Sequence, residues 1–218
     1  MNKIAFDNGF NSQLVKNATF VGEPGIPMLS KMNNIDIPSN LVPFTKLRTS
    51  KTKKGYIHFY EHDRYFSSFL NNPSKYLEGL KNYDGVITPD PTMFVDESKC
   101  LLETATYINR AYGFFLQENG IPVIPNIRWT NEKSFDYCFL GAPKHYVVSI
   151  STHGCCRSKK QKEDFRNGLL KMLEVLEPTD VLVHGYMPKE IFESIPYEVN
   201  FHRFPSEFEQ THSNKENC

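Results

Sequence analysis

The sequence predicts an α/β fold: a mainly parallel sheet with crossover helices, preceded by an irregular N-terminal arm. From residue 41 onward, short β-branched or aromatic runs alternate with segments of helical periodicity, as in repeated strand–helix–strand units. Several runs, such as 147–150 and 181–183, are apolar throughout, which is typical of strands covered by helices on both faces. We expect the sheet either to stay open or to curl into a reduced or distorted barrel.

Residues 1–40 form the arm, because Gly and Pro interrupt every apolar run before residue 41. Phe20, Ile26 and Met28 are expected to anchor it against the body. Residues 41–205 then form a single α/β domain. The last stretch, 206–218, is polar, so we expect a flexible tail whose deletion leaves the melting temperature unchanged.

Seven strands are expected within the domain. They cover 41–47, 55–60, 85–88, 121–128, 146–151, 180–184 and 198–201. The uninterrupted apolar residues of the third, fifth and sixth strands are expected to form the core. These are Val86, Ile87, Val147, Val148, Val181, Leu182 and Val183.

Helices fill three of the intervals between strands. Between 64 and 83 we expect two short helices with a break near Asn71, because Asn72 and Pro73 fit an N-cap and a first helical residue. Apolar residues recur every three or four positions from 101 to 115 and from 165 to 176, and each run ends ahead of a Gly or Pro. Both runs predict long helices.

Composition excludes several classes of protein. Lys and Arg total 25, and Asp and Glu also total 25, which argues against an extensive nucleic-acid surface. The five cysteines are odd in number and sparse, so reduced thiols are expected. The N-terminus lacks a secretory apolar segment, and no stretch is apolar enough to span a bilayer. We therefore expect a cytoplasmic protein without membrane association.

The ligand site is predicted from the ends of the strands. Carboxyl ends of parallel strands meet at one edge of a sheet, where loops and helix N-termini converge. Polar and aromatic residues follow five of the predicted strands, which predicts a pocket at that edge, although any one of them also fits a helix cap or a solvated group. The candidate ligand-binding residues are Asn126, Arg128, Trp129, Thr152, Gly154, His184 and Tyr186.

Asp90 and His153 are the candidate acid and base if the pocket performs chemistry. Arg128 and the helix starting near Glu163 are the candidate anion contacts, and replacing Arg128 with Ala is expected to abolish anion binding at little cost in stability. Asp90, Arg128 and His153 are expected to line one concavity. Two alternatives stay open: Asp90 as a turn residue before a proline, and Arg128 paired with Asp136 or Glu132.

The string from His153 to Cys156 allows three interpretations. Zinc could bind His153, one cysteine and His184, but neither a CxxC pair nor an HExxH helix accompanies them. Cys155 could be a nucleophile activated by a histidine. The interpretation we favour is a tight turn at Gly154 with ordinary thiols, so no metal site is predicted and no cofactor is identified.

Two basic runs, 46–54 and 157–162, lie in predicted loops. The second opens a helix whose free N–H groups could hold phosphate, so an anionic ligand or a nucleic-acid backbone is a conceivable partner. Solvated loops have the same composition. Neither a GxxxxGK[ST] nor a GxGxxG string is present, which disfavours ordinary P-loop and dinucleotide sites.

Five motifs in order resemble one known family. They are 85–90 (GVITPD), 110–113 (RAYG), 121–129 (IPVIPNIRW), 134–139 (SFDYCF) with Gly141, and 147–154 (VVSISTHG). Together they resemble the domain of unknown function 4417 family over roughly residues 41–186. The resemblance implies a bacterial, archaeal or phage setting, often on a mobile element, and implies no reaction. The positions that match are Asp90, Asn126, Arg128, Trp129, Asp136, Thr152 and Gly154, whereas Cys155 and Cys156 are not part of the motif set.

Two hypotheses follow. The first is a pocket for a small polar or anionic ligand, nucleotide-like or sugar-like, with or without acid/base hydrolytic chemistry. The second is a non-enzymatic phage accessory protein that binds a host protein or nucleic acid. A deep pocket with converging Asp90, Arg128 and His153 favours the first, and a shallow face beside an exposed aromatic patch favours the second.

Overall fold

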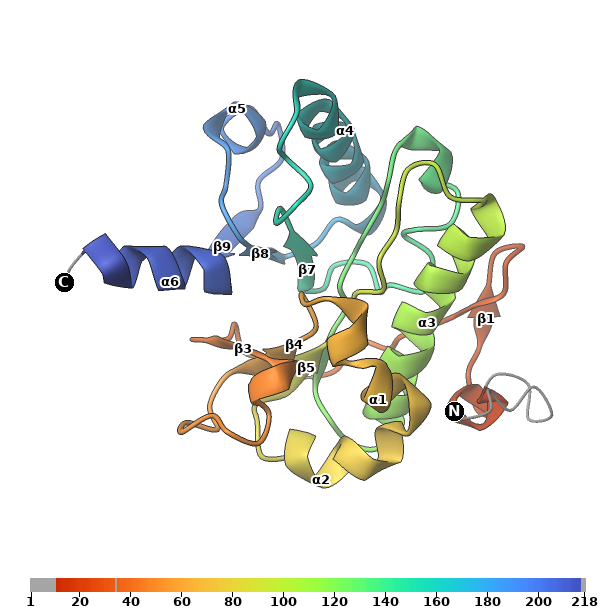
Figure 1. Cartoon of the computed structure of the whole chain (residues 1–218). Coiled ribbons are helices and arrows are strands. Elements are labelled where there is room, and N and C mark those ends of the chain that lie inside the picture. The colour runs from red at the N-terminus through yellow and green to blue at the C-terminus, as the bar shows by residue number, and fades with distance from the viewer. Residues whose placement is uncertain (1–10, 34, 217–218) are drawn as a thin grey trace.

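Two parallel sheets, joined at their edges, carry the helices in a computed structural model that describes residues 11–33 and 35–216 (Figure 1). Our expectations for residues 1–10 of the arm and 217–218 of the tail lie outside the described residues. The strands are short and helices cover the outer side of each sheet. The mainly parallel α/β class is therefore confirmed.

The first sheet contains β3 (Leu41–Pro43), β4 (Tyr56–His58), β5 (Gly85–Ile87) and β6 (Val123–Ile124), paired in that order and all parallel. These strands are shorter than the sequence pattern indicates. The run expected as strand 41–47 turns into a 3₁₀ helix, Phe44–Lys46, directly after β3. Pro122 and Pro125 bound β6, and neither has an N–H group to donate to a ladder.

The second sheet contains β7 (Val148–Ser151), β8 (Asp180–His184) and β9 (Asn200–Phe204), also parallel and in chain order. An isolated parallel bridge between Asn126 and Ser149 joins the two sheets. Its hydrogen bonds run from Ile127 N–H to the Ser149 carbonyl at 2.8 Å and from Ser149 N–H to the Pro125 carbonyl at 2.9 Å. Among the described residues no pairing connects β9 to β3, so the sheet is open and not a closed barrel.

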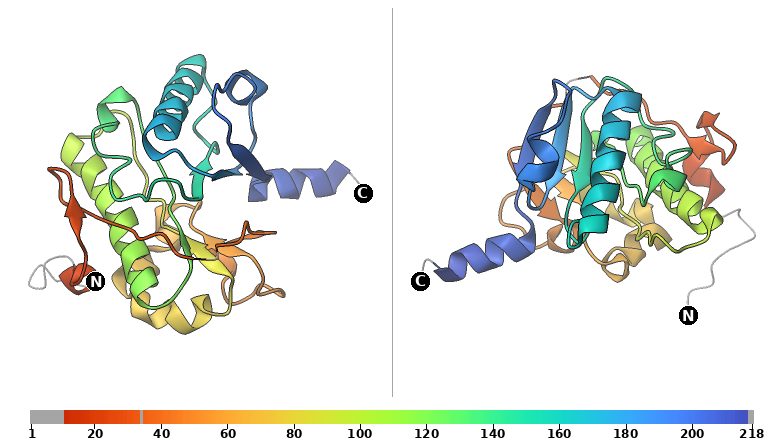
Figure 2. Two further views of the ribbon diagram at one scale, coloured as in Figure 1. Left: turned by 180° about the vertical axis from the view of Figure 1, so that it is seen from behind. Right: turned by 90° about the horizontal axis from the view of Figure 1, so that it is seen from above.

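Helices cover the outer side of each sheet (Figures 1 and 2). α1 (Ser67–Asn71), α2 (Leu77–Leu80) and α3 (Lys99–Glu118) lie against the first sheet, and α4 (Lys159–Leu176) and α5 (Lys189–Phe192) lie against the second. The expected break near Asn71 is confirmed, because α1 ends there and Pro73 starts a 3₁₀ helix.

Three apolar clusters hold these layers together. One packs the outer face of the first sheet against α3, and another packs the outer face of the second sheet against α4. The third joins residues of both sheets, including Leu41 and Ile87 from the first and Leu182 from the second. The inner faces of the two sheets therefore pack on each other. All seven predicted core residues are buried, which confirms that part of the prediction.

The arm contains a short 3₁₀ helix (Ser12–Val15) and an antiparallel pair, β1 (Phe20–Val21) with β2 (Ile26–Pro27). Ile26 is fully buried, as expected, but Phe20 and Met28 are exposed. Leu29 holds the arm against the body, because its side chain is buried and its N–H donates to the Gly141 carbonyl at 2.8 Å.

The stretch expected as a flexible tail forms helix α6 (Glu207–Glu216), which projects from the end of β9 (Figure 1). Its first turn is tied to the body. Glu207 lies 3.1 Å from His58 Nε2, and Glu209 forms an ion pair with Arg203. No described helix is long and apolar enough to cross a membrane.

Candidate functional site

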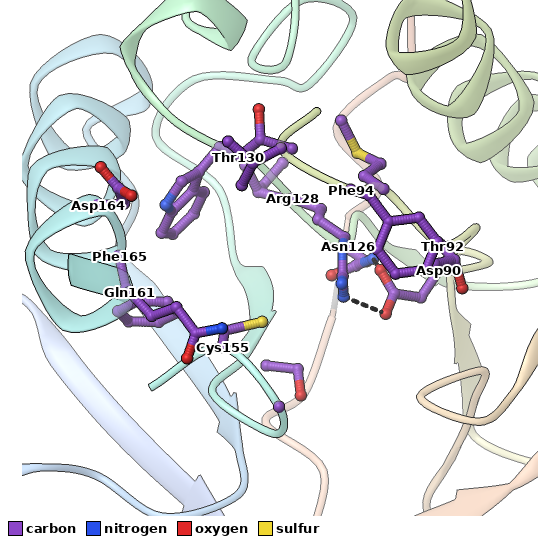
Figure 3. Close-up of a pocket in the computed structure, with 16 residues that line it drawn as sticks. Asp90, Thr92, Phe94, Asn126, Arg128, Thr130, Cys155, Gln161, Asp164 and Phe165 are labelled. Carbon is purple, nitrogen blue, oxygen red and sulfur yellow. Dashed lines mark hydrogen bonds and ion pairs between the residues drawn. The ribbon is translucent and has the colours of Figure 1, made fainter. Parts of the chain in front are cut away.

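A cavity of about 260 Å³ opens at the carboxyl ends of β5, β6 and β7 (Figure 3). Its walls come from the loop after β5, the segment after β6, the turn after β7 and the first half of α4. The lining residues are Asp90, Thr92, Met93, Phe94, Val95, Asn126, Ile127, Arg128, Trp129, Thr130, Ser151, Gly154, Cys155, Gln161, Asp164 and Phe165.

Asp90 is held on both carboxylate oxygens. Asn126 Nδ2 donates to Oδ1 at 2.8 Å, and Arg128 Nη1 donates to Oδ2 at 2.8 Å. The Asp90 side chain is only 10% exposed and that of Arg128 is 25% exposed. The ion pair with Asp90 raises the pKa of Arg128, despite an opposing effect of burial. Arg128 is therefore fixed by Asp90 and not by the nearby acidic residues, Glu132 or Asp136, that the sequence offered.

Asn126 and Arg128 both face Asp90, as side chains two positions apart do in an extended chain. The described strand ends at Ile124, and only Asn126 makes the bridge to the second sheet. Hydrogen bonds to Ser149 on both sides of Asn126 hold the segment after β6 beside β7, and both side chains reach one carboxylate.

A buried polar network that the sequence did not reveal supports Asn126. Its N–H donates to Thr88 Oγ1 at 2.8 Å, and its carbonyl accepts from Asn109 Nδ2 at 3.1 Å and from Arg110 Nη1 at 3.0 Å. Arg110 is almost fully buried in α3, and burial lowers its pKa to about 10. It lies in the 110–113 motif, a signal that could have pointed to it although the sequence analysis did not single it out.

Aromatic side chains form opposite walls of the cavity. Trp129 packs on Phe165 of α4, with ring centroids 5.2 Å apart. In Figure 3, Gln161, Asp164 and Phe165 lie on one side, and Thr92 and Phe94 lie on the other beside Asp90. Phe94 is 64% exposed and belongs to a loop held by Thr92, whose hydroxyl donates to Asp63 at 2.7 Å.

Cys155 lines the cavity, but its chemistry is that of a protonated thiol. Burial raises the pKa of Cys155, and the neighbouring Arg128 offsets this only in part. Burial also raises the pKa of Cys156, to about 12. Because the thiolate is the nucleophile, the structure does not support an activated cysteine here.

Four of the predicted site residues do not line this cavity. Thr152 is buried and donates from Oγ1 to the Tyr186 carbonyl at 2.6 Å, so it shapes the turn after β7. Tyr186 is 61% exposed. His153 and His184 are not among the cavity's lining residues, and their ring centroids lie 6.4 Å apart. Asp90 and Arg128 therefore share a concavity that His153 does not line.

The N-terminus of α4 differs from the expected anion site. The helix begins at Lys159, before Glu163, and Ser158 and Gln161 form a capping box that satisfies the N–H groups of Ser158 and Gln161. Lys160 and Lys162 form ion pairs with Asp164 and Glu190. The first turn therefore has few unsatisfied donors for a phosphate.

Fold and pocket define an open parallel α/β protein with a polar and aromatic cavity at the carboxyl edge of its sheet. The chain belongs to the family described as "Domain of unknown function (DUF4417)", which matches residues 18–204. It is 32% identical over 133 residues to "Gene 1 protein" of Mycobacterium phage L5, covering 61% of this chain and 58% of that protein.

A second relative is "Gene 1 protein" of Mycobacterium phage D29, which is 29% identical over 152 residues, 68% of this chain and 56% of that protein. The chain thus spans less than three fifths of the length of these two relatives. No solved structure matches it. The family resemblance inferred from the five motifs is confirmed, as is the likeness to phage proteins.

Proposed function

We propose that the cavity around Arg128 binds a small polar or anionic ligand, nucleotide-like or sugar-like. The observation that carries the proposal is the guanidinium, which Asp90 holds through Nη1 at the cavity wall. Within the described residues Arg128 makes this one hydrogen bond, so its remaining N–H groups are donors for a ligand. A ligand oxygen placed there completes the guanidinium's hydrogen bonds.

The size and walls of the cavity support a compact ligand with a planar part. Its volume of about 260 Å³ is slightly below the roughly 300–1,000 Å³ of drug-sized ligand sites. Trp129 and Phe165 offer apolar surfaces on one side, and Phe94 offers a ring on the other. A nucleobase or sugar ring between them buries apolar area while its polar groups meet Asn126 and Arg128.

The proposed activity of this cavity is ligand binding, and the proposal does not include acid/base hydrolysis of the ligand. Both oxygens of Asp90 already accept hydrogen bonds, so the carboxylate is engaged as a clamp for Arg128 and Asn126. His153, the other candidate for proton transfer, is not among the lining residues. A general base must reach the proton that it abstracts, and His153 does not line the cavity that Asp90 lines.

Calorimetry with AMP, glucose 6-phosphate and inorganic phosphate tests the proposal on the full chain, alongside native mass spectrometry for a retained small molecule. Arg128→Gln should weaken binding of a phosphorylated probe about tenfold or more, because a charge-assisted hydrogen bond contributes about 1.5–3 kcal/mol. Arg157→Gln is the matched control, since Arg157 is exposed and does not line the cavity.

Phe94→Ala separates the two halves of the proposed site. It should weaken AMP binding and leave inorganic phosphate unaffected, because Phe94 offers only a ring. If a retained ligand or a probe binds with an affinity that neither Arg128→Gln nor Phe94→Ala changes, it does not bind in this cavity. So would the failure of every probe together with a mass spectrum of bare protein.

The second candidate function is binding of a host protein, and exposed apolar side chains favour it. Phe94, Val95 and Leu101 are each more than half exposed, and Leu101 does not line the cavity. Leu101→Asp therefore distinguishes the two functions. Leu101→Asp should leave binding of the small-molecule probes intact. If the wild-type chain forms a specific cross-link to a host protein and Leu101→Asp abolishes it, the result supports the second function.

A further inference from the structure

Two histidines and a glutamate from distant parts of the chain meet beside the cavity. His58 ends β4, His184 ends β8 and Glu207 begins α6. His58 Nε2 lies 3.1 Å from Glu207 Oε1, and His184 Nε2 lies 3.5 Å from Glu207 Oε2. One donor atom from each residue lies within 4.8 Å of the others.

The two histidines of the cluster are buried, the Glu207 side chain is 36% exposed, and one histidine nitrogen makes no hydrogen bond within the described residues. His58 and His184 are 0% and 1% exposed. In the described part of the chain, His184 Nε2 makes no hydrogen bond, although it faces a carboxylate oxygen. A buried polar atom without a partner costs about 1–3 kcal/mol, so a cation between the nitrogen and the carboxylate stabilises the arrangement.

We propose that His58, His184 and Glu207 bind a divalent transition-metal ion of the borderline class, such as Zn²⁺ or Fe²⁺. Imidazole nitrogens and carboxylate oxygens are the donors that such ions prefer. Ligand atoms about 2.0–2.2 Å from one ion lie no more than roughly 4.4 Å apart. The two histidine–carboxylate separations, 3.1 and 3.5 Å, fall within that limit, and all the donor atoms lie within 4.8 Å of one another, so binding requires a small approach of the side chains.

The surroundings of the two rings determine how each one binds. Ser151 Oγ lies 3.2 Å from His184 Nδ1 and can accept its proton, which leaves Nε2 with a free lone pair. His58 Nδ1 accepts from Tyr60 N–H at 3.2 Å, so the ring proton lies on Nε2 and points at Glu207. Metal binding through His58 displaces this proton, and the contact with Tyr60 N–H must relax.

The proposed metal site lies next to the ligand cavity. Ser151 lines the cavity and contacts His184 Nδ1 at 3.2 Å. Tyr60 stacks on His184 with ring centroids 4.6 Å apart, and its hydroxyl donates to Asn126 Oδ1 at 3.1 Å. Three protein ligands leave at least one coordination position for water or another ligand, as in catalytic and not structural zinc sites. The inference does not depend on the proposed ligand for Arg128.

Titration of untagged, EDTA-treated full chain with Zn²⁺ tests the site by calorimetry. One ion per chain is expected. Glu207→Gln and His184→Gln should each weaken binding at least tenfold. Two controls should bind like the wild type: Glu198→Gln, an exposed carboxylate outside the cluster, and the double variant Cys155→Ser/Cys156→Ser, which removes the alternative thiol ligands.

Co²⁺ provides a second readout that needs no variant. A wild-type complex held by nitrogen and oxygen should show ligand-field bands without a sulfur-to-cobalt charge-transfer band. A sulfur band, loss of binding in the cysteine double variant, or Zn²⁺ affinity unchanged in Glu207→Gln would each overturn the assignment. A wild-type protein that binds no Zn²⁺ at all would do the same.

Discussion

Asp90 determines which substitutions Arg128 tolerates. The sequence alone led us to expect that Arg128→Ala costs little stability, but the ion pair with a mostly buried carboxylate changes this. Arg128→Ala should lower the free energy of unfolding by about 1–3 kcal/mol, because Asp90 then keeps a poorly solvated charge with one remaining donor. Urea unfolding measures the loss.

A double-mutant cycle isolates the interaction of this pair. Asp90→Asn combined with Arg128→Ala should cost less than the sum of the two single changes, because the unpaired charge is gone. Strict additivity would mean that the two side chains do not interact in solution, contrary to their 2.8 Å contact.

The cysteines give a second test at the scale of single residues. Because burial raises the pKa of Cys155 and of Cys156, both thiols stay protonated at neutral pH. Iodoacetamide at pH 7.5 should therefore modify them much more slowly than Cys100, which is exposed. Peptide mass spectrometry over time measures the rates. Faster labelling of Cys155 than of Cys100 would revive the nucleophile hypothesis.

At the scale of elements, a glycine fixes how α4 meets the cavity wall. A Cβ atom at Gly168 would lie 2.1 Å from Nε1 of Trp129, which is too close for a rigid indole. Gly168→Ala should therefore destabilise the protein by about 1–3 kcal/mol through overpacking, although alanine is the better helix former by about 0.5–1 kcal/mol. Thermal unfolding measures the balance, and fluorescence of the single tryptophan reports its displacement.

Gly79 in α2 is the matched control for this substitution. A Cβ atom there meets Leu47 at 3.5 Å, an ordinary van der Waals distance. Gly79→Ala should be neutral or mildly stabilising. If both alanine variants behave alike, the contact between Trp129 and α4 does not constrain the packing.

At the scale of the whole molecule, the first turn of α6 bridges the two sheets. Glu207 contacts His58 of the first sheet and His184 of the second. Deleting residues 207–218 in the presence of EDTA should lower the free energy of unfolding by about 1–3 kcal/mol, which corresponds to roughly 2–12 °C in melting temperature for a chain of this size. The same measurement should show little change when only residues 211–218 are removed. Equal melting temperatures for the full chain and both deletion variants would support the original prediction that the tail is dispensable.

The sequence by itself determined the class of fold, most of the helices and the core. Hydrophobic periodicity is a local property, so continuous apolar runs such as Val181–Leu182–Val183 identified strands buried on both faces. Parallel topology then placed Asp90 and Arg128 at one edge, because all carboxyl ends of parallel strands meet there. The motifs around them also identified the family.

Only the tertiary structure decided what those residues do to each other. Asp90 and Arg128 are 38 positions apart, and whether they share a ligand or neutralise each other depends on a distance that no local pattern contains. His58 and Glu207 are 149 positions apart. Residues 206–218 have no apolar face, so hydrophobic periodicity could not reveal that this segment docks through the carboxylates of Glu207 and Glu209. Polar contacts of long sequence separation leave no periodic trace, and that is why the cluster of His58, His184 and Glu207 emerged only from the structure.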